Sequence, residues 1–140
     1  MILKYDRGVL MTEEEIRKYL AILKDRSYEM RIRKTKDNLK NQITQAMLKK
    51  SDDDMYELVR ELEVCDFDFN KPDNPQPDNR LNQTGEVWFF RKMKWNEPFY
   101  IKTKVVERLK KIIIFSCHID NIESRPDYQF YADNVLFLYY

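Results

Sequence analysis

The sequence contains few of the residues that build metal sites and disulfide frameworks, with two cysteines and one histidine in 140 residues. Cys65 and Cys117 stand in no CxxC or Cys/His ligand spacing, so the sequence predicts no zinc site and a reduced protein. One histidine and scattered aspartates make a poor ligand set for a transition metal. We therefore expect neither a metal nor another cofactor.

Long apolar runs are also missing. No stretch approaches the ~18 apolar residues that suggest a membrane-spanning helix. Residues 1–15, MILKYDRGVLMTEEE, lack the apolar core and the small-residue cleavage site of a signal peptide. These absences predict a cytoplasmic protein with no membrane partner.

Charge, in contrast, is abundant and segregated into blocks. Charged residues make up 35% of the chain, yet the net charge is only +1. Residues 1–50 hold 13 basic and 7 acidic side chains, 51–86 hold 3 and 11, 87–118 hold 8 and 2, and 119–140 hold 1 and 4. A fold that brings the two basic blocks together would carry a positive face. In the plain alternative, the blocks are solvated helix and loop surfaces.

The first half of the chain has the pattern of three amphipathic helices and one short strand. Thr12 followed by Glu15 forms a capping box that starts a helix over about residues 13–25. Alternating apolar residues predict a strand over 28–33. Two more helices follow. The first is capped by Thr35 or Asp37, and its apolar stripe is Leu39, Ile43, Ala46 and Met47. The second is capped by Ser51 with Asp54, and its apolar stripe is Met55, Leu58, Val59 and Leu62.

The second half has the pattern of a sheet. A long polar loop over 70–85 contains three of the five prolines. Strands over 86–93, 99–106 and 110–118 are joined by short connections, which predicts an antiparallel meander, and the final VLFLYY is either a further strand or a packed segment. Helices first and strands after predict an α+β fold, with the helices packed on one face of a small, mostly antiparallel sheet. The length fits a single domain over 1–140.

Alternation along the last two strands separates a core face from an open face. In strand 99–106, one face is apolar and the other carries Tyr100 with Lys102 and Lys104. Strand 110–118 is apolar on both faces, so we expect cover on both sides for most of its length, with His118 at its end. Strict alternation places Lys111, Ile113, Phe115 and Cys117 on one face and Ile112, Ile114, Ser116 and His118 on the other.

Histidine, tyrosine and lysine on neighbouring strands suit the cleavage of RNA by its own 2′-OH, which needs a proton acceptor, a proton donor and cations. His118 titrates near neutral pH and can serve as acid or base. Lys102 and Arg91 can hold the phosphate, and Tyr100 or an exposed Trp88 can stack on a splayed base. In the simplest alternative, His118 bonds a backbone carbonyl, the aromatic rings pack across the sheet and the lysines are solvated.

Four landmarks in order resemble a known family. They are the Asp66-Phe67 pair after the third helix, the hydrophobic run after Gly85, the Tyr-Ile-Lys of 100–102 and the Ser-x-His of 116–118. Their order over about residues 16–120 resembles the MqsR family of bacterial toxins, within the wider RelE-like group of ribonuclease toxins. The resemblance implies a toxin-like core over about residues 12–120 and leaves 121–140 as a C-terminal extension.

The resemblance implies an endoribonuclease that cleaves single-stranded mRNA without a metal and is held silent by a cognate antitoxin protein. The family's site tyrosine and terminal basic residue fall on Tyr100 and His118. Its lysine position falls on Phe69, with Lys71 two residues later, and its glutamine position has Gln83 as the nearest candidate. The predicted site therefore has Tyr100, His118, Lys102 and Lys71 in catalytic roles, and Arg91, Lys104, Trp88 and Gln83 as RNA contacts.

Two other functions stay open. The unmatched lysine and glutamine positions favour a catalytically inactive module that binds RNA or protein on the same fold, and a homo-oligomer is compatible with either function. The acidic block 51–86 would suit a phage or mobile-element protein that mimics nucleic acid, although a helix start and a loop account for most of its charge. Cleavage of RNA in the presence of EDTA would separate the enzyme from the module.

Overall fold

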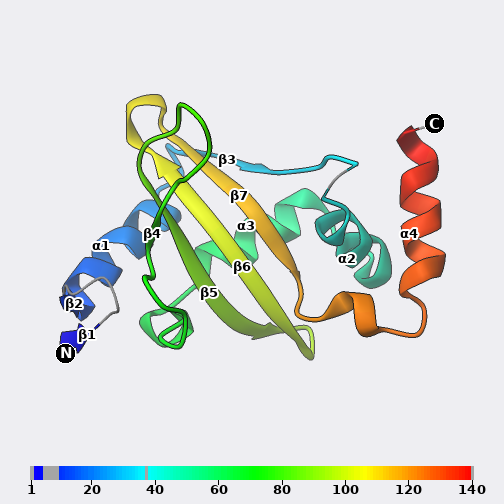
Figure 1. The fold of residues 1–140 in the computed structure, drawn as a ribbon, viewed down its shortest axis with the longest axis horizontal. Helices are drawn as coiled ribbons and strands as arrows, with labels where there is room; N and C mark the ends of the chain where they lie inside the picture. Colours follow the sequence, from blue (N-terminus) through cyan, green and yellow to red (C-terminus); the bar gives the residue numbers. More distant parts are fainter. Residues whose placement is uncertain (1, 5–9, 37, 140) are drawn as a thin grey trace.

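The computed structural model describes residues 2–4, 10–36 and 38–139, which contain four α-helices and a five-stranded mixed sheet (Figure 1). The α+β class predicted from the sequence is therefore confirmed. A short antiparallel hairpin of β1 (Ile2–Lys4) and β2 (Leu10–Thr12) precedes the first helix. The helices are α1 (Glu13–Lys24), α2 (Lys40–Leu48), α3 (Asp52–Arg60) and α4 (Tyr128–Leu136), and the strands of the larger sheet are β3 (Glu29–Ile32), β4 (Gln76–Pro77), β5 (Glu86–Lys94), β6 (Glu97–Val106) and β7 (Lys111–Ile119).

The strands of the larger sheet lie in the order β3-β7-β6-β5-β4. β5, β6 and β7 form the predicted antiparallel meander. β3 instead pairs in parallel with β7. Between these two strands the chain passes through α2, α3 and the first strands of the meander, and this long connection lets it enter β7 in the same direction as β3. β4 pairs with the start of β5, so the segment 70–85 is not a loop throughout.

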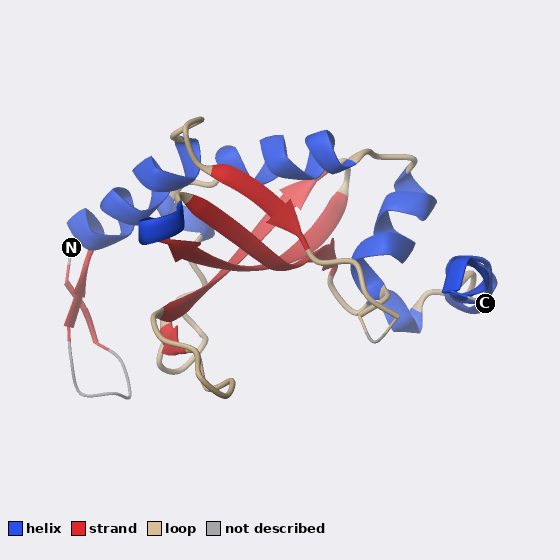
Figure 2. Cartoon of the chain, turned by 90° about the horizontal axis from the view of Figure 1, so that it is seen from above, coloured by secondary structure: helices blue, strands red, loops and turns tan. Residues whose placement is uncertain are grey.

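Helices α1 and α3 cover one face of this sheet, and the main core lies between helices and sheet (Figure 2). Both helices begin at the predicted caps. The Thr12 hydroxyl accepts a hydrogen bond from the Glu15 N–H at 3.1 Å, and Ser51 with Asp54 forms a capping box. The largest fully buried side chains are Phe67, Phe90, Phe99, Met11, Ile16, Leu23, Ile43, Met55, Leu58, Leu62, Ile101 and Ile112.

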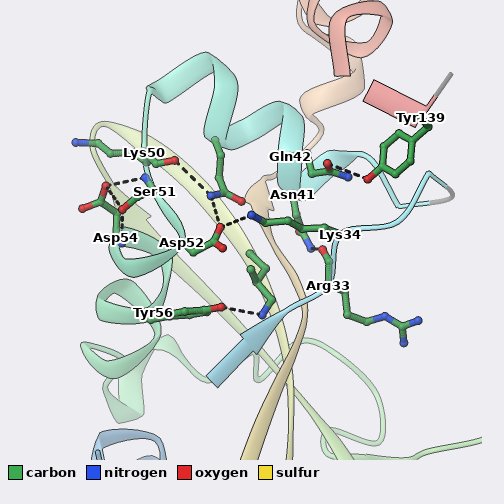
Figure 3. A network of polar contacts seen from close by, with 12 residues as sticks. Arg33, Lys34, Asn41, Gln42, Lys50, Ser51, Asp52, Asp54, Tyr56 and Tyr139 are labelled. Carbon is green, nitrogen blue, oxygen red and sulfur yellow. Dashed lines mark hydrogen bonds and ion pairs between the residues drawn. The ribbon is translucent and has the colours of Figure 1, made fainter. Parts of the chain in front are cut away.

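Helix α2 has no side-chain cap of its own and is tied to its neighbours by polar contacts (Figure 3). Its N-cap is Leu39, so the cap expected at Thr35 is wrong, and Asp37 lies outside the described residues. Asp52, at the start of α3, accepts a hydrogen bond from Gln45 Nε2 at 2.9 Å. This contact holds the start of α3 against the end of α2.

Polar side chains of α2 also close the outer edge of β7. β3 pairs only with the first part of β7, so the backbone groups beyond that point need other partners. Asn41 Nδ2 donates to the Phe115 carbonyl at 3.0 Å, and the Cys117 N–H donates to Asn41 Oδ1 at 2.9 Å. The Ile119 N–H donates to Thr44 Oγ1 at 3.1 Å. Buried Asn41 and Thr44 therefore replace a neighbouring strand at this edge.

The C-terminal residues form a helix rather than a strand. α4 lies beside α2 (Figure 1), and Ala132 and Val135, three residues apart, are buried on one helix face. The Tyr139 hydroxyl donates to Gln42 Oε1 at 3.0 Å and ties the end of the chain to α2 (Figure 3). The alternative that VLFLYY forms a strand is therefore wrong. The other alternative, a packed segment, is confirmed for Val135. Tyr140 lies outside the described residues.

Candidate active site on the open face of the sheet

A β-bulge in β7 decides which side chains reach the face opposite α1 and α3, which we call the open face. In the register of β6 and β7, Phe115 is an extra residue between Ile114 and Ser116. A bulge inverts the alternation beyond it, so the strict alternation predicted over 110–118 is wrong, and His118 lies on the open face. The residues of β7 in the main core are Ile112, Ile114, Cys117 and Ile119.

Tyr100 of β6 and His118 of β7 are direct cross-strand partners, and Arg91 of β5 completes the row. The ring centroids of Tyr100 and His118 are 5.5 Å apart. In the neighbouring row, Lys102 lies opposite Ser116. The two rows are two residues apart along each strand, or about 6.8 Å. The tyrosine, histidine and lysine predicted from the sequence therefore share one face.

His118 is held in one tautomer. Its Nδ1 lies 2.9 Å from the Ile119 carbonyl oxygen, and because a carbonyl can only accept, Nδ1 carries the proton. Burial lowers the pKa of His118, and its effect, together with that of the nearby Lys40 ammonium, outweighs the hydrogen bond to Ile119, which raises the pKa. At neutral pH the imidazole is therefore uncharged, with a lone pair on Nε2. The carbonyl bond expected in the simplest alternative is present, and it leaves Nε2 as the proton acceptor.

Tyr100 and His118 line a hollow of about 440 Å³. Lys36 and Lys40, just before and at the start of α2, form part of its wall, and Tyr128 of α4 forms another. The sequence reasoning missed these three residues, although the basic run before α2 was visible. Burial raises the pKa of Tyr100, so its phenol keeps its proton at neutral pH and can act as a donor.

Lys102 lies among other cations on the open face. Its Nζ is 5.5 Å from the Phe115 ring centroid and 5.7 Å from that of Phe89. Lys71 Nζ lies 4.5 Å over Phe89, and the Arg80 guanidinium lies 4.7 Å over Phe115. Burial, and then the neighbouring Lys71 and Arg80, lowers the pKa of Lys102.

The two basic blocks of the sequence meet on the open face. The first basic block contributes Arg33, Lys36 and Lys40 to this face, and the second contributes Arg91 and Lys102.

Arg91 is already engaged by carboxylates. Its Nε lies 3.0 Å from Asp68 Oδ2, and its guanidinium also pairs with Asp120. The same guanidinium lies 5.4 Å from the Tyr100 ring centroid. A phosphate would have to compete with two carboxylates for Arg91, so the arrangement suits the orientation of Tyr100 better than the binding of phosphate.

None of the four predicted RNA contacts is among the described residues that line the hollow: besides Arg91, these are Trp88, Lys104 and Gln83. Trp88 is 8% exposed and stacks on Tyr19 at 4.0 Å in the main core, so the expectation of an exposed ring is wrong. Lys104 is 4% exposed with its Nζ 2.7 Å from Asp78, so the expectation of an open lysine there is also wrong. Gln83 Oε1 lies 3.5 Å from Lys104 Nζ, toward the C-terminal end of β6. A loop returns over this end of the sheet, which alternation alone did not reveal.

The acidic block 51–86 is largely paired within the protein. Its carboxylates form ion pairs with lysines and arginines from both basic blocks and with Arg80 of the block itself, so much of its charge is balanced locally. The pairs are Asp52 with Lys34, Glu57 with Arg26, Glu61 with Lys94, Asp66 with Lys92, Asp68 with Arg91, and Asp78 with Arg80 and Lys104.

Within the ranges that the structure describes, no three His, Cys, Asp or Glu side chains are grouped so that they could hold a metal ion. Nor does any helix in these ranges have both the length and the apolar content to cross a bilayer. Comparison with protein-family models, with curated proteins and with solved structures finds no match.

Proposed function

We propose that the protein is a metal-independent endoribonuclease of the RelE-like toxin type that acts on single-stranded mRNA. The observation that carries the proposal is the pair of Tyr100 and His118, whose ring centroids lie 5.5 Å apart in adjacent strands, with Lys102 in the next row. An imidazole with a lone pair, a phenol that keeps its proton and an ammonium are the groups that attack by a 2′-OH requires.

In the proposed reaction, the 2′ oxygen attacks the adjacent phosphorus. The O2′–P bond forms and the P–O5′ bond breaks. His118 Nε2 takes the proton of the 2′-OH, and Tyr100 gives its proton to the departing 5′ oxygen. Lys102 stabilises the additional negative charge on the phosphate. The products are a 2′,3′-cyclic phosphate and a 5′-hydroxyl, and proton exchange with water restores both side chains.

The resemblance to the MqsR family supports the same assignment. Tyr100 and His118 fall on two of that family's site positions, and Lys71, near a third, lies on the same face of the sheet as Lys102. The proposal therefore includes the partner that the resemblance implies, a cognate antitoxin protein that covers this face and silences the enzyme.

The test is the cleavage of a short single-stranded RNA in EDTA. We expect products that end in a 2′,3′-cyclic phosphate, and a rate roughly 10²–10⁴-fold lower for His118→Asn, which lacks the general base. Tyr100→Phe should also be slower. A DNA oligonucleotide with a single ribonucleotide should be cut only after that ribonucleotide, because only this sugar has a 2′-OH.

The matched control is Tyr28→Phe. Tyr28 lies beside Lys110, at the opposite end of β7 from His118. This variant should cleave like the wild type, and circular dichroism should show that all variants are folded. Equal cleavage by the wild type and His118→Asn would assign the activity to another enzyme in the preparation and overturn the proposal.

A second candidate is a module that binds single-stranded RNA without cleaving it. The observation that favours it is the pair of open-face phenyl rings with cations above them, Lys71 over Phe89 and Arg80 over Phe115. Aromatic rings among basic side chains are typical of surfaces that bind single-stranded nucleic acid. RNA binding without cleavage in the same assay would support this candidate.

A further inference from the structure

A second hollow lies on the open face, next to Lys102. Its volume is about 340 Å³, within the ~300–1,000 Å³ range of ligand pockets. One wall is the segment 76–80, and the other contains Val87, Phe89, Lys102 and Phe115. Of these lining residues, the proposed cleavage step uses only Lys102.

A buried carboxylate holds the wall that carries Arg80. The Asp78 side chain accepts hydrogen bonds from Arg80 Nε at 3.0 Å and Arg80 Nη2 at 2.7 Å, and from Lys104 Nζ at 2.7 Å. The Asp78 N–H donates to the Gly85 carbonyl at 2.9 Å and closes the loop. The guanidinium is therefore oriented over Phe115 before a ligand arrives, which lowers the entropic cost of binding.

The lining of this hollow suits a nucleotide. Asp78 is the one acidic residue among the described lining residues, and Arg80 and Lys104 already neutralise it. Gln76 and Asn79 bring amide groups, which can hydrogen-bond the edges of a nucleobase. The Arg80 guanidinium lies 4.7 Å from the Phe115 ring centroid, and a guanidinium plane can itself stack a base.

We propose that this hollow binds the nucleobase of the nucleotide next to the cleaved phosphate, stacked on the Arg80 guanidinium above Phe115. The position of the cleaved phosphate rests on the proposed function. Lys102 lies one row, about 6.8 Å, from the row of Tyr100 and His118. That separation is comparable to one nucleotide of extended single-stranded RNA. The base that fits between Arg80 and the amide of Asn79 would set the sequence preference.

The test measures binding in the His118→Asn background, where cleavage does not interfere. A six-nucleotide RNA is prepared as a series in which one abasic site occupies each position in turn. With Arg80 present, we expect one position at which loss of the base weakens binding roughly 5- to 150-fold, the range that stacking of one base supplies. Arg80→Lys keeps the charge but lacks the planar guanidinium, so this penalty should disappear.

Arg26→Lys is the matched control, because Arg26 pairs with Glu57 of α3 and should leave the abasic penalty unchanged. If Arg80→Lys does not fold, Phe115→Leu removes the ring beneath the same stack and should abolish the same penalty. An equal penalty with and without Arg80, or no RNA binding at all, overturns the inference. Absence of cleavage by the wild type overturns the proposed function alone, since the abasic comparison does not depend on cleavage.

Discussion

Replacement of Asp78 by asparagine removes one negative charge from a buried ion pair and leaves the side-chain volume nearly unchanged. Only 3% of the Asp78 side chain and 5% of the Lys104 side chain are exposed, so the ammonium of Lys104 cannot regain contact with water. Loss of one partner of a buried ion pair costs about 3–5 kcal/mol of folding free energy. We expect the low end, about 3 kcal/mol, because the amide oxygen of asparagine can still accept a hydrogen bond from Lys104 or Arg80.

The assay is urea unfolding at pH 7 of the wild type, Asp78→Asn, Lys104→Met and the double variant. Lys104→Met should cost less than Asp78→Asn, because Asp78 keeps its two hydrogen bonds from Arg80. The double variant should recover part of the loss, since no charge is then buried without a partner. A loss below about 0.5 kcal/mol for Asp78→Asn, or effects of the single variants that simply add, would refute the reasoning.

The same carboxylate predicts how stability changes in acid. The Arg80 guanidinium, and then Lys104, holds the pKa of Asp78 well below its usual value, against the opposing effect of burial. The unfolded chain therefore binds a proton at a higher pH than the folded protein. The contribution of Asp78 is complete above about pH 4–5 and is lost as the pH falls toward the folded-state pKa. Asp78→Asn should flatten this acid limb, and an unchanged limb would contradict the assignment.

Three further predictions concern His118, the cysteines and Tyr19. The general base His118 must be neutral, and burial lowers its pKa below the ordinary ~6.5. The cleavage rate should therefore rise as the pH increases through this lowered pKa and level off near neutrality. A rate that falls over this range would contradict the role of His118 as general base. Exposed Cys65 should react with a thiol reagent in the native protein, whereas Cys117, which is buried with a raised pKa, should react only after denaturation; two reactive native thiols would contradict its burial. Tyr19→Phe breaks a buried 2.7 Å hydrogen bond to Thr103 and should lower the free energy of unfolding by about 1–3 kcal/mol in urea titrations, whereas an unchanged value would mean that the bond contributes nothing.

The helices and the meander could be predicted because local patterns encode them. Thr12 caps α1 by a hydrogen bond only three residues away, and the short connections force β5, β6 and β7 to pair in order. The parallel pairing of β3 could not be predicted in the same way. Met30 pairs with Ile112, and the long intervening segment contains no signal for this partner. The helix α4 was missed because the prediction concerned the run VLFLYY, which shares only Val135 and Leu136 with the helix.

The candidate site was predictable in part for the same reason. Tyr100 and His118 stand on consecutive strands of the meander, so the short connection predicts that they lie close together, but the bulge at Phe115 is what places His118 directly opposite Tyr100. Lys36, Lys40 and Tyr128 reach the hollow from the start of α2 and from α4, and only tertiary packing brings them there. The buried position of Trp88 against Tyr19 and the cover over Lys104 depend on the same long-range contacts.

Asn41 links the fold to the site, because it bonds backbone groups of β7 that lie beyond the end of β3 and have no strand partner on that edge. Its side chain is fully buried, donates to the Phe115 carbonyl and accepts from the Cys117 N–H, next to His118. Asn38 Nδ2 also donates to the Phe115 carbonyl, at 2.9 Å. In Asn41→Ala, the Phe115 carbonyl therefore keeps a partner while the Cys117 N–H loses its own. We expect a loss of about 1–3 kcal/mol for Asn41→Ala and a smaller one for Asn38→Ala.

Amide hydrogen exchange tests this at a single residue. The Cys117 amide should be protected in the wild type and in Asn38→Ala, and it should exchange faster in Asn41→Ala, because only the last variant removes its acceptor. The backbone at Cys117 also sets where the His118 ring stands against Tyr100, so RNA cleavage should decline in the same order. A Cys117 amide that stays protected in Asn41→Ala would mean that pairing with β6 alone holds the bulge, and that burial of Asn41 serves only the packing of α2.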